Sequence, residues 1–179
     1  MSYDFYGRDP HGEAWVEPLF SDTHPAFGGD GMAGTVIVTS GGYTRCGNYT
    51  SNVSGMWAEC LTAALEVVPD ARRWCGADAK AFNAAGRTVS RPRPDGGWES
   101  GPMEVDEDRL CLRDLAGVRC GDLVPVLAAA VEWGVEHIDR LRAHNPSNGW
   151  GNAEGAVTYL WDIQRFCEQN PDLLLEISS

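Results

Sequence analysis

Two stretches of the chain concentrate asparagine, glycine and hydroxyl residues where a helix is expected to begin. An asparagine amide offers both a hydrogen-bond donor and an acceptor, which suits a nucleobase edge or the hydroxyls of a sugar. The unsatisfied N–H groups in the first turn of a helix attract a phosphate or a carboxylate. These two junctions are therefore the candidate ligand sites of the chain.

The downstream junction covers residues 143–152 and contains three asparagines, two glycines, one histidine and Trp150. A tryptophan between two glycines is presented with little steric hindrance, so its ring can stack on a base, a sugar or a partner's side chain. The polar residues also have structural explanations, because Asn145 precedes a helix-ending proline, Asn148 precedes a turn glycine and Asn152 can cap the next helix. Both interpretations stay open, and the predicted ligand-binding residues here are Asn145, Asn148, Trp150 and Asn152.

The upstream junction covers residues 46–55, where a strand is expected to end and a helix to begin. Capping of that helix explains Asn52 alone. Asn48, Thr50 and Ser54 are more polar groups than one cap requires. The predicted ligand-binding set therefore also includes Asn48, Thr50, Asn52 and Ser54. Two such helix ends can converge on one anionic ligand if the fold brings them together.

Local patterns around the junctions predict an α+β fold. A β-branched run at 35–39 is typical of a strand, and 43–49 can return as its hairpin partner. Elsewhere the spacing of apolar residues predicts three main helices at 53–67, 122–141 and 153–169. A shorter helix is expected at 71–82 and a closing strand at 173–177. The simplest assembly is a small antiparallel sheet with the three main helices packed on one face.

The remaining segments show no sustained period. Residues 1–33 are rich in glycine, proline and aromatic residues, which predicts an irregular arm with a short strand at 14–20. The Pro- and Gly-rich stretch 87–102 predicts an exposed loop inside a probable insert at 69–110. A length of 179 residues suits one domain, so 1–179 is interpreted as a single domain.

Charge and cysteine usage restrict the class of protein. The formal net charge of −12 repels a polyanion such as DNA or RNA at long range, so no nucleic-acid partner is expected. No apolar run reaches about 18 residues and the first residues form no signal peptide, which predicts no membrane span and a cytoplasmic protein. The six cysteines include no Cys-x-x-Cys and match no zinc spacing, so neither a metal site nor a cofactor is predicted.

The two junctions also carry a resemblance to known proteins. The motifs concerned are Asn48-x-Thr50-x-Asn52-Val53-x-x-Met56 and Asn145-Pro146-x-Asn148-Gly149-Trp150-Gly151. Together they resemble a family of small uncharacterised phage and bacterial proteins. The resemblance covers about 43–67 and 121–179. It implies an accessory role in phage or bacteria and does not imply an activity.

Three functions are compatible with these residues. The first is a non-catalytic binder of a small polar or anionic ligand, such as a nucleotide. The second is a protein-interaction module, for example a phage factor that occupies a host protein, whose acidic surface suits a basic partner or imitates nucleic acid. The third is an enzyme acting on a nucleotide or a sugar. The sequence contains no Gly-rich phosphate loop and no His-Glu-x-x-His motif, so we rank the binder first and the enzyme last.

Overall fold

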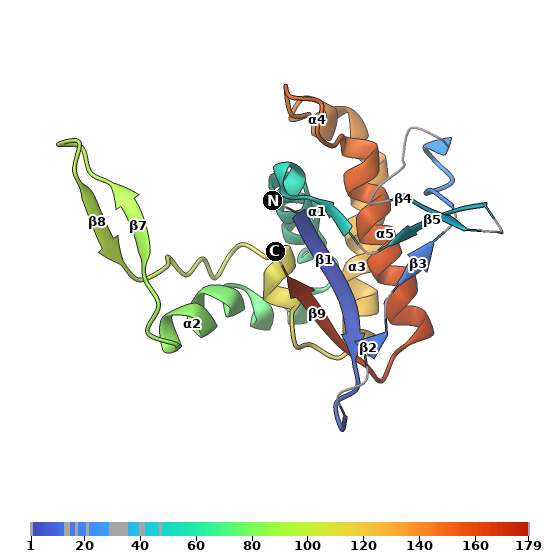
Figure 1. Cartoon of the computed structure of the whole chain (residues 1–179), viewed down its shortest axis with the longest axis horizontal. Helices are drawn as coiled ribbons and strands as arrows, with labels where there is room; N and C mark the ends of the chain where they lie inside the picture. Colours follow the sequence, from blue (N-terminus) through green and yellow to red (C-terminus); the bar gives the residue numbers. More distant parts are fainter. Residues whose placement is uncertain are drawn as a thin grey trace.

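The computed structural model describes residues 2–12, 15–16, 18–20, 22–28, 36–39, 42–46 and 48–178 and has the predicted α+β fold (Figure 1). Its three long helices are α1 (Ser54–Ala64), α3 (Cys120–Glu136) and α5 (Ala153–Gln169). The shorter helices are η2 (Ser51–Val53), η3 (Pro69–Trp74), α2 (Ala77–Ala84), η4 (Leu112–Leu115) and α4 (Ile138–Arg142).

The strands of the described residues form three antiparallel sheets. The main sheet contains β1 (Ser2–Arg8), β2 (Trp15–Val16), β6 (Asn48–Thr50) and β9 (Leu174–Ser178). The second sheet contains β3 (Leu19–Phe20), β4 (Val36–Thr39) and β5 (Gly42–Cys46). The third is a hairpin of β7 (Val89–Pro92) and β8 (Trp98–Gly101).

β1 is the strand to which all others of the main sheet pair, and this corrects the prediction of an irregular arm at 1–33. β9 pairs with most of β1, while β6 and β2 pair with its two ends. Phe5 is buried, and its ring centroid lies 5.4 Å from that of Tyr159. The next inward position is Gly7, where a Cβ would collide with Phe166. Because a glycine takes the place of an apolar side chain there, the alternating pattern of the strand is hidden in the sequence.

The predicted hairpin of 35–39 with 43–49 is confirmed for β4 and β5, which pair in antiparallel register in the second sheet. Its return strand ends at Cys46, earlier than predicted, and residues 48–49 belong to β6 of the main sheet. The closing strand is confirmed as β9. The chain leaves the second sheet after β5 and joins the main sheet at β6, which pairs with the start of β1. The upstream junction therefore lies at an end of the main sheet, directly before α1.

The three main helices are confirmed, but the predicted helix 122–141 is split at His137 into α3 and α4. The ring of His137 stacks on Trp133 with 4.3 Å between centroids. Its Nδ1 lies 2.9 Å from the Trp133 carbonyl oxygen, which also accepts the backbone N–H of His137. Such competition between side chain and backbone favours a helix end. α4 then leads directly into the downstream junction.

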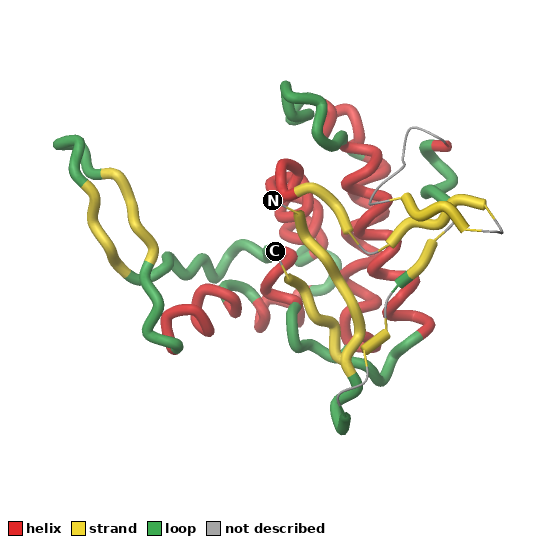
Figure 2. The backbone as a smooth tube through the Cα atoms, in the orientation of Figure 1, coloured by secondary structure: helices red, strands yellow, loops and turns green. Residues whose placement is uncertain are grey.

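The region 69–110 differs most from its prediction. The expected helix at 71–82 is two shorter helices, η3 and α2. The expected loop at 87–102 is the β7–β8 hairpin, which projects from the rest of the chain (Figures 1 and 2). Asp95 closes its turn, because the carboxylate accepts a hydrogen bond of 2.9 Å from the N–H of Gly97. A turn that aligns two strands explains why this Pro- and Gly-rich stretch is regular.

Candidate functional site

The two polar junctions meet in space. The backbone N–H of Asn152 donates a hydrogen bond of 3.1 Å to the hydroxyl of Tyr49, a residue distant in sequence. Gly151 has a φ of +93°, and a Cβ there would lie 2.7 Å from Thr50 Cγ2 and 2.9 Å from Val53 Cγ1. The left-handed backbone and the close approach both require glycine at this position. The downstream loop is thus seated directly on the start of the upstream helix.

A shallow hollow of about 470 Å³ lies where the junctions meet. It is lined by Tyr49, Asn145, Pro146, Gly149, Gly151 and Asn152. Asn145 and Asn152 are the predicted ligand-binding residues that line this hollow.

Two first-turn N–H groups of α5, those of Ala153 and Gly155, donate to the junction's own asparagines. Asn152 caps the helix as predicted, and its Oδ1 accepts a hydrogen bond of 2.7 Å from the N–H of Gly155. Asn145 reaches across the loop, and its Oδ1 accepts the N–H of Ala153 at 2.8 Å. The expectation that these N–H groups are open to a phosphate or carboxylate is therefore corrected for Ala153 and Gly155.

The loop holds Trp150 outward on a fixed backbone. The N–H of Trp150 donates to Asn148 Oδ1 at 3.0 Å, and the N–H of Gly149 donates to the Pro146 carbonyl at 3.1 Å. Gly149 has a φ of +72°, which an L side chain rarely adopts. The side chain of Trp150 is nevertheless 68% exposed. The turn thus presents a large apolar ring to solvent from a backbone fixed by hydrogen bonds.

The predicted residues of the upstream junction do not line the hollow. α1 is preceded by Val53 at the N-cap position and has no side-chain cap, so the prediction that Asn52 caps it is wrong. Thr50 Oγ1 accepts the N–H of Asn52 at 3.4 Å, and Asn52 and Ser54 are exposed. The backbone of Asn48 pairs with β1. Thr50 lies against Gly151, which lines the hollow.

Tyr49 is the site residue that the sequence analysis missed. It is only 8% exposed, and its ring stacks on Tyr159 with 5.8 Å between centroids. Burial raises the pKa of the Tyr49 phenol, so the group stays protonated at neutral pH. Its oxygen accepts the N–H of Asn152 and its O–H remains available as a donor at the edge of the hollow. The only signal for Tyr49 in the sequence was its position between two polar residues, Asn48 and Thr50, in a predicted strand.

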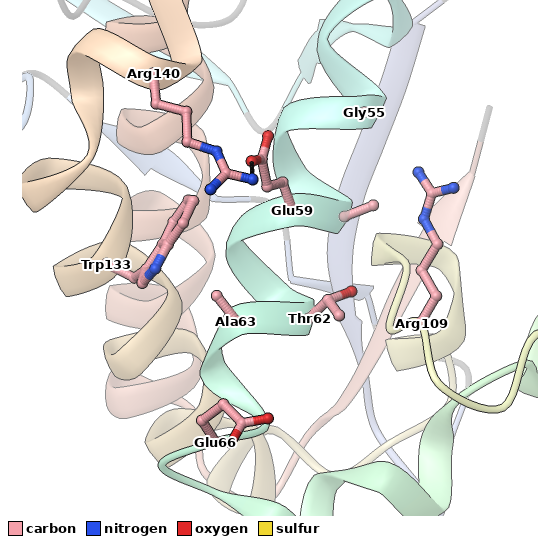
Figure 3. Close-up of a pocket in the computed structure, with 9 residues that line it drawn as sticks. Gly55, Glu59, Thr62, Ala63, Glu66, Arg109, Trp133 and Arg140 are labelled. Carbon is pink, nitrogen blue, oxygen red and sulfur yellow. Dashed lines mark ion pairs between the residues drawn. The ribbon is translucent and has the colours of Figure 1, made fainter.

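A larger hollow of about 670 Å³ runs along α1 (Figure 3). It is lined by Gly55, Ala58, Glu59, Thr62, Ala63, Glu66, Arg109, Trp133 and Arg140. Arg140 pairs with Glu59 at 2.5 Å and lies over the ring of Trp133, 5.6 Å from its centroid. Arg109 stands on the other side of α1 and forms no ion pair within the described part of the chain. Two carboxylates balance the two arginines, so the groove has no excess of charge to select an ion.

Comparisons of the chain with protein-family models, with curated proteins and with solved structures find no match. Among the residues that the structure describes, no group of three or more His, Cys, Asp or Glu side chains is placed to hold a metal ion. No helix within the described ranges has the length and apolar character needed to cross a membrane. The function is therefore inferred from the geometry of the junctions.

Proposed function

We propose that the protein is a non-catalytic binder of a small, planar, polar ligand, held at the hollow between the two junctions. The observation that carries this proposal is the position of Trp150, exposed on a loop that is fixed beside the hollow. A flat ligand stacks on the indole ring, and its polar edge reaches into the hollow. The polar wall comes from two parts of the chain, since Tyr49 and Asn145 both line it.

The groups left at the hollow are neutral hydrogen-bond donors, which suit the acceptors of a nucleobase or a sugar. The Oδ1 of Asn145 is taken by the N–H of Ala153, which leaves the amide NH₂ to donate to a ligand. The O–H of Tyr49 is a second donor at the same hollow. Two donors match a carbonyl oxygen, a ring nitrogen or a sugar hydroxyl. A net charge of −12 further disfavours a polyphosphate.

A protein partner is the second candidate, favoured by the same exposed ring of Trp150. Buried aromatic anchors dominate many protein interfaces, and an acidic chain suits a basic partner surface. The resemblance to phage and bacterial proteins supports an accessory role, such as occupying a host protein. An enzyme on a nucleotide or sugar ranks third, because the hollow is lined by groups that bind and orient and supplies no evident nucleophile–base pair.

The proposal predicts that Trp150→Ala weakens ligand binding by about 5- to 150-fold, the equivalent of about 1–3 kcal/mol of stacking. The measurement is a thermal-shift titration with nucleosides, nucleoside monophosphates and cyclic dinucleotides. A ligand at a hundredfold excess over its dissociation constant stabilises the wild type by about 2–3 kcal/mol. Trp98→Ala is the matched control, since Trp98 is 71% exposed and lies on β8 instead of the junction.

Equal loss of binding in both tryptophan variants would place the ligand elsewhere and refute the role of the junction. If none of these compounds stabilises the wild type, the second candidate takes precedence. Capture from a host lysate with wild type, Trp150→Ala and Trp98→Ala then decides whether a protein is retained through Trp150.

A further inference from the structure

An ion pair closes the base of the downstream loop. Arg142 is the last residue of α4 and Glu154 is the second residue of α5, so residues 143–152 lie between them (Figure 1). The Nε of Arg142 lies 2.6 Å from the Oε1 of Glu154. The Nη1 of Arg142 lies 2.7 Å from Asp139 Oδ1, and this second contact stays within α4. Arg142 therefore supplies an ion pair that joins α4 to α5.

Glu154 is the fixed partner of this pair. Its side chain is 11% exposed, while that of Arg142 is 49% exposed. The carboxylate lies in the first turn of a 17-residue helix, where the helix dipole favours a negative charge. Separation of the two groups leaves a carboxylate that is mostly shielded from water without its cation, which is unfavourable. The pair thus draws the end of α4 toward the start of α5.

α4 depends on contacts of this kind. Its five residues are too few for a stable isolated helix, and it begins where the longer helix breaks at His137. Of these five residues, Leu141 alone is buried. Arg140 pairs with Glu59 of α1, and that contact does not fix the distance to α5. Since the loop continues directly from α4, the position of α4 decides where the loop begins.

We propose that Arg142 is a positioning residue of the ligand site, an inference that rests on the proposed function. By fixing both ends of the loop, the ion pair keeps Asn145 Oδ1 on the N–H of Ala153. It also keeps the N–H of Asn152 on the hydroxyl of Tyr49. Loss of the ion pair opens the loop in part of the molecules, and the apparent affinity falls in proportion to the fraction that stays closed.

Amide hydrogen exchange, measured by NMR on the full chain without ligand, tests this role. The N–H groups of Asn152 and Ala153 donate to side-chain oxygens, so their exchange reports opening of the loop. In Arg142→Gln both amides are expected to exchange about tenfold faster or more, because a nearly buried charge loses its partner. Asp139→Asn is the first control, since it removes the contact within α4 and keeps the pair with Glu154.

Arg8→Gln is the second control, because it breaks an ion pair of similar burial away from the loop. Arg8 pairs with Glu176 at 2.7 Å between β1 and β9, and the two side chains are 35% and 23% exposed. General destabilisation would accelerate the exchange of the loop amides in both variants, whereas positioning by Arg142 affects them only in Arg142→Gln. Unchanged exchange in Arg142→Gln, or equal acceleration in either control, overturns the proposal.

A titration with adenosine and guanosine relates the loop to binding. Both nucleosides are neutral and Arg142 does not line the hollow, so the substitution acts on their affinity through the loop. Arg142→Gln is expected to raise the dissociation constant about tenfold, with the same NMR spectrum of the bound site at saturation. An unchanged dissociation constant overturns the proposal. If the exchange responds as expected but neither nucleoside binds the wild type, the proposed ligand class is refuted and the role of Arg142 in holding the loop is supported.

Discussion

Replacement of Trp57 by alanine is expected to lower the free energy of unfolding by about 3–5 kcal/mol. Trp57 is 0% exposed, and its Nε1 donates a hydrogen bond of 3.1 Å to the Ala156 carbonyl. Its ring stacks on Tyr159 at 5.0 Å and meets Tyr3 edge-on at 5.4 Å. Truncation therefore removes a large buried surface, leaves a cavity between α1, α5 and the main sheet, and removes the hydrogen bond to the Ala156 carbonyl.

Urea unfolding followed by circular dichroism measures this loss. Trp57→Phe is the matched variant, because it keeps an aromatic ring but not the Nε1 donor, and it should cost about 1–3 kcal/mol. A loss below about 1 kcal/mol for Trp57→Ala would contradict the position of this ring in the core. The substitution should also disturb the hollow, because Trp57 packs beside Tyr49, with 6.2 Å between the two ring centroids.

The parts of the fold that sequence predicts well are those with local signals. α5 has a strict apolar stripe between Asn152 and Asn170, and it begins and ends as expected. The hairpin of β4 and β5 follows from a β-branched run and a glycine turn. β1 has no such signal, because its inward positions include Gly7 and its partners β6 and β9 are far away in sequence. Its place at the centre of the sheet depends on contacts that no local pattern records.

The same limit applies to the candidate site. The residue types at the junctions are visible in the sequence, but the destination of each side-chain oxygen is not. Asn145 was expected to end a helix or bind a ligand, and its oxygen accepts the N–H of Ala153 across the loop. Tyr49 and Asn152 are 103 positions apart in the chain, and only the folded structure joins them. Sequence thus identifies the polar junctions, while tertiary packing decides which groups remain for a ligand.

Gly155→Ala is expected to destabilise the protein by about 2–3 kcal/mol, although alanine favours helices over glycine. A Cβ at position 155 would collide with the hydroxyl of Tyr49 and would lie 2.8 Å from Asn152 Oδ1. The phenol cannot retreat easily, because its ring is packed against Trp57 and Tyr159. The downstream loop must therefore move away from the upstream junction, and the hollow opens.

A double-mutant cycle with Tyr49→Phe separates this collision from a general effect on α5. Tyr49→Phe alone removes the acceptor of the Asn152 N–H and should cost about 1–3 kcal/mol. In the double variant the hydroxyl that causes the nearest collision is absent, so the two losses should fall short of additivity by at least about 1 kcal/mol. Strict additivity would mean that Gly155 and Tyr49 act independently. Coupling would show that one hydroxyl holds the two junctions together, because the same oxygen both limits position 155 and anchors the loop that carries Trp150.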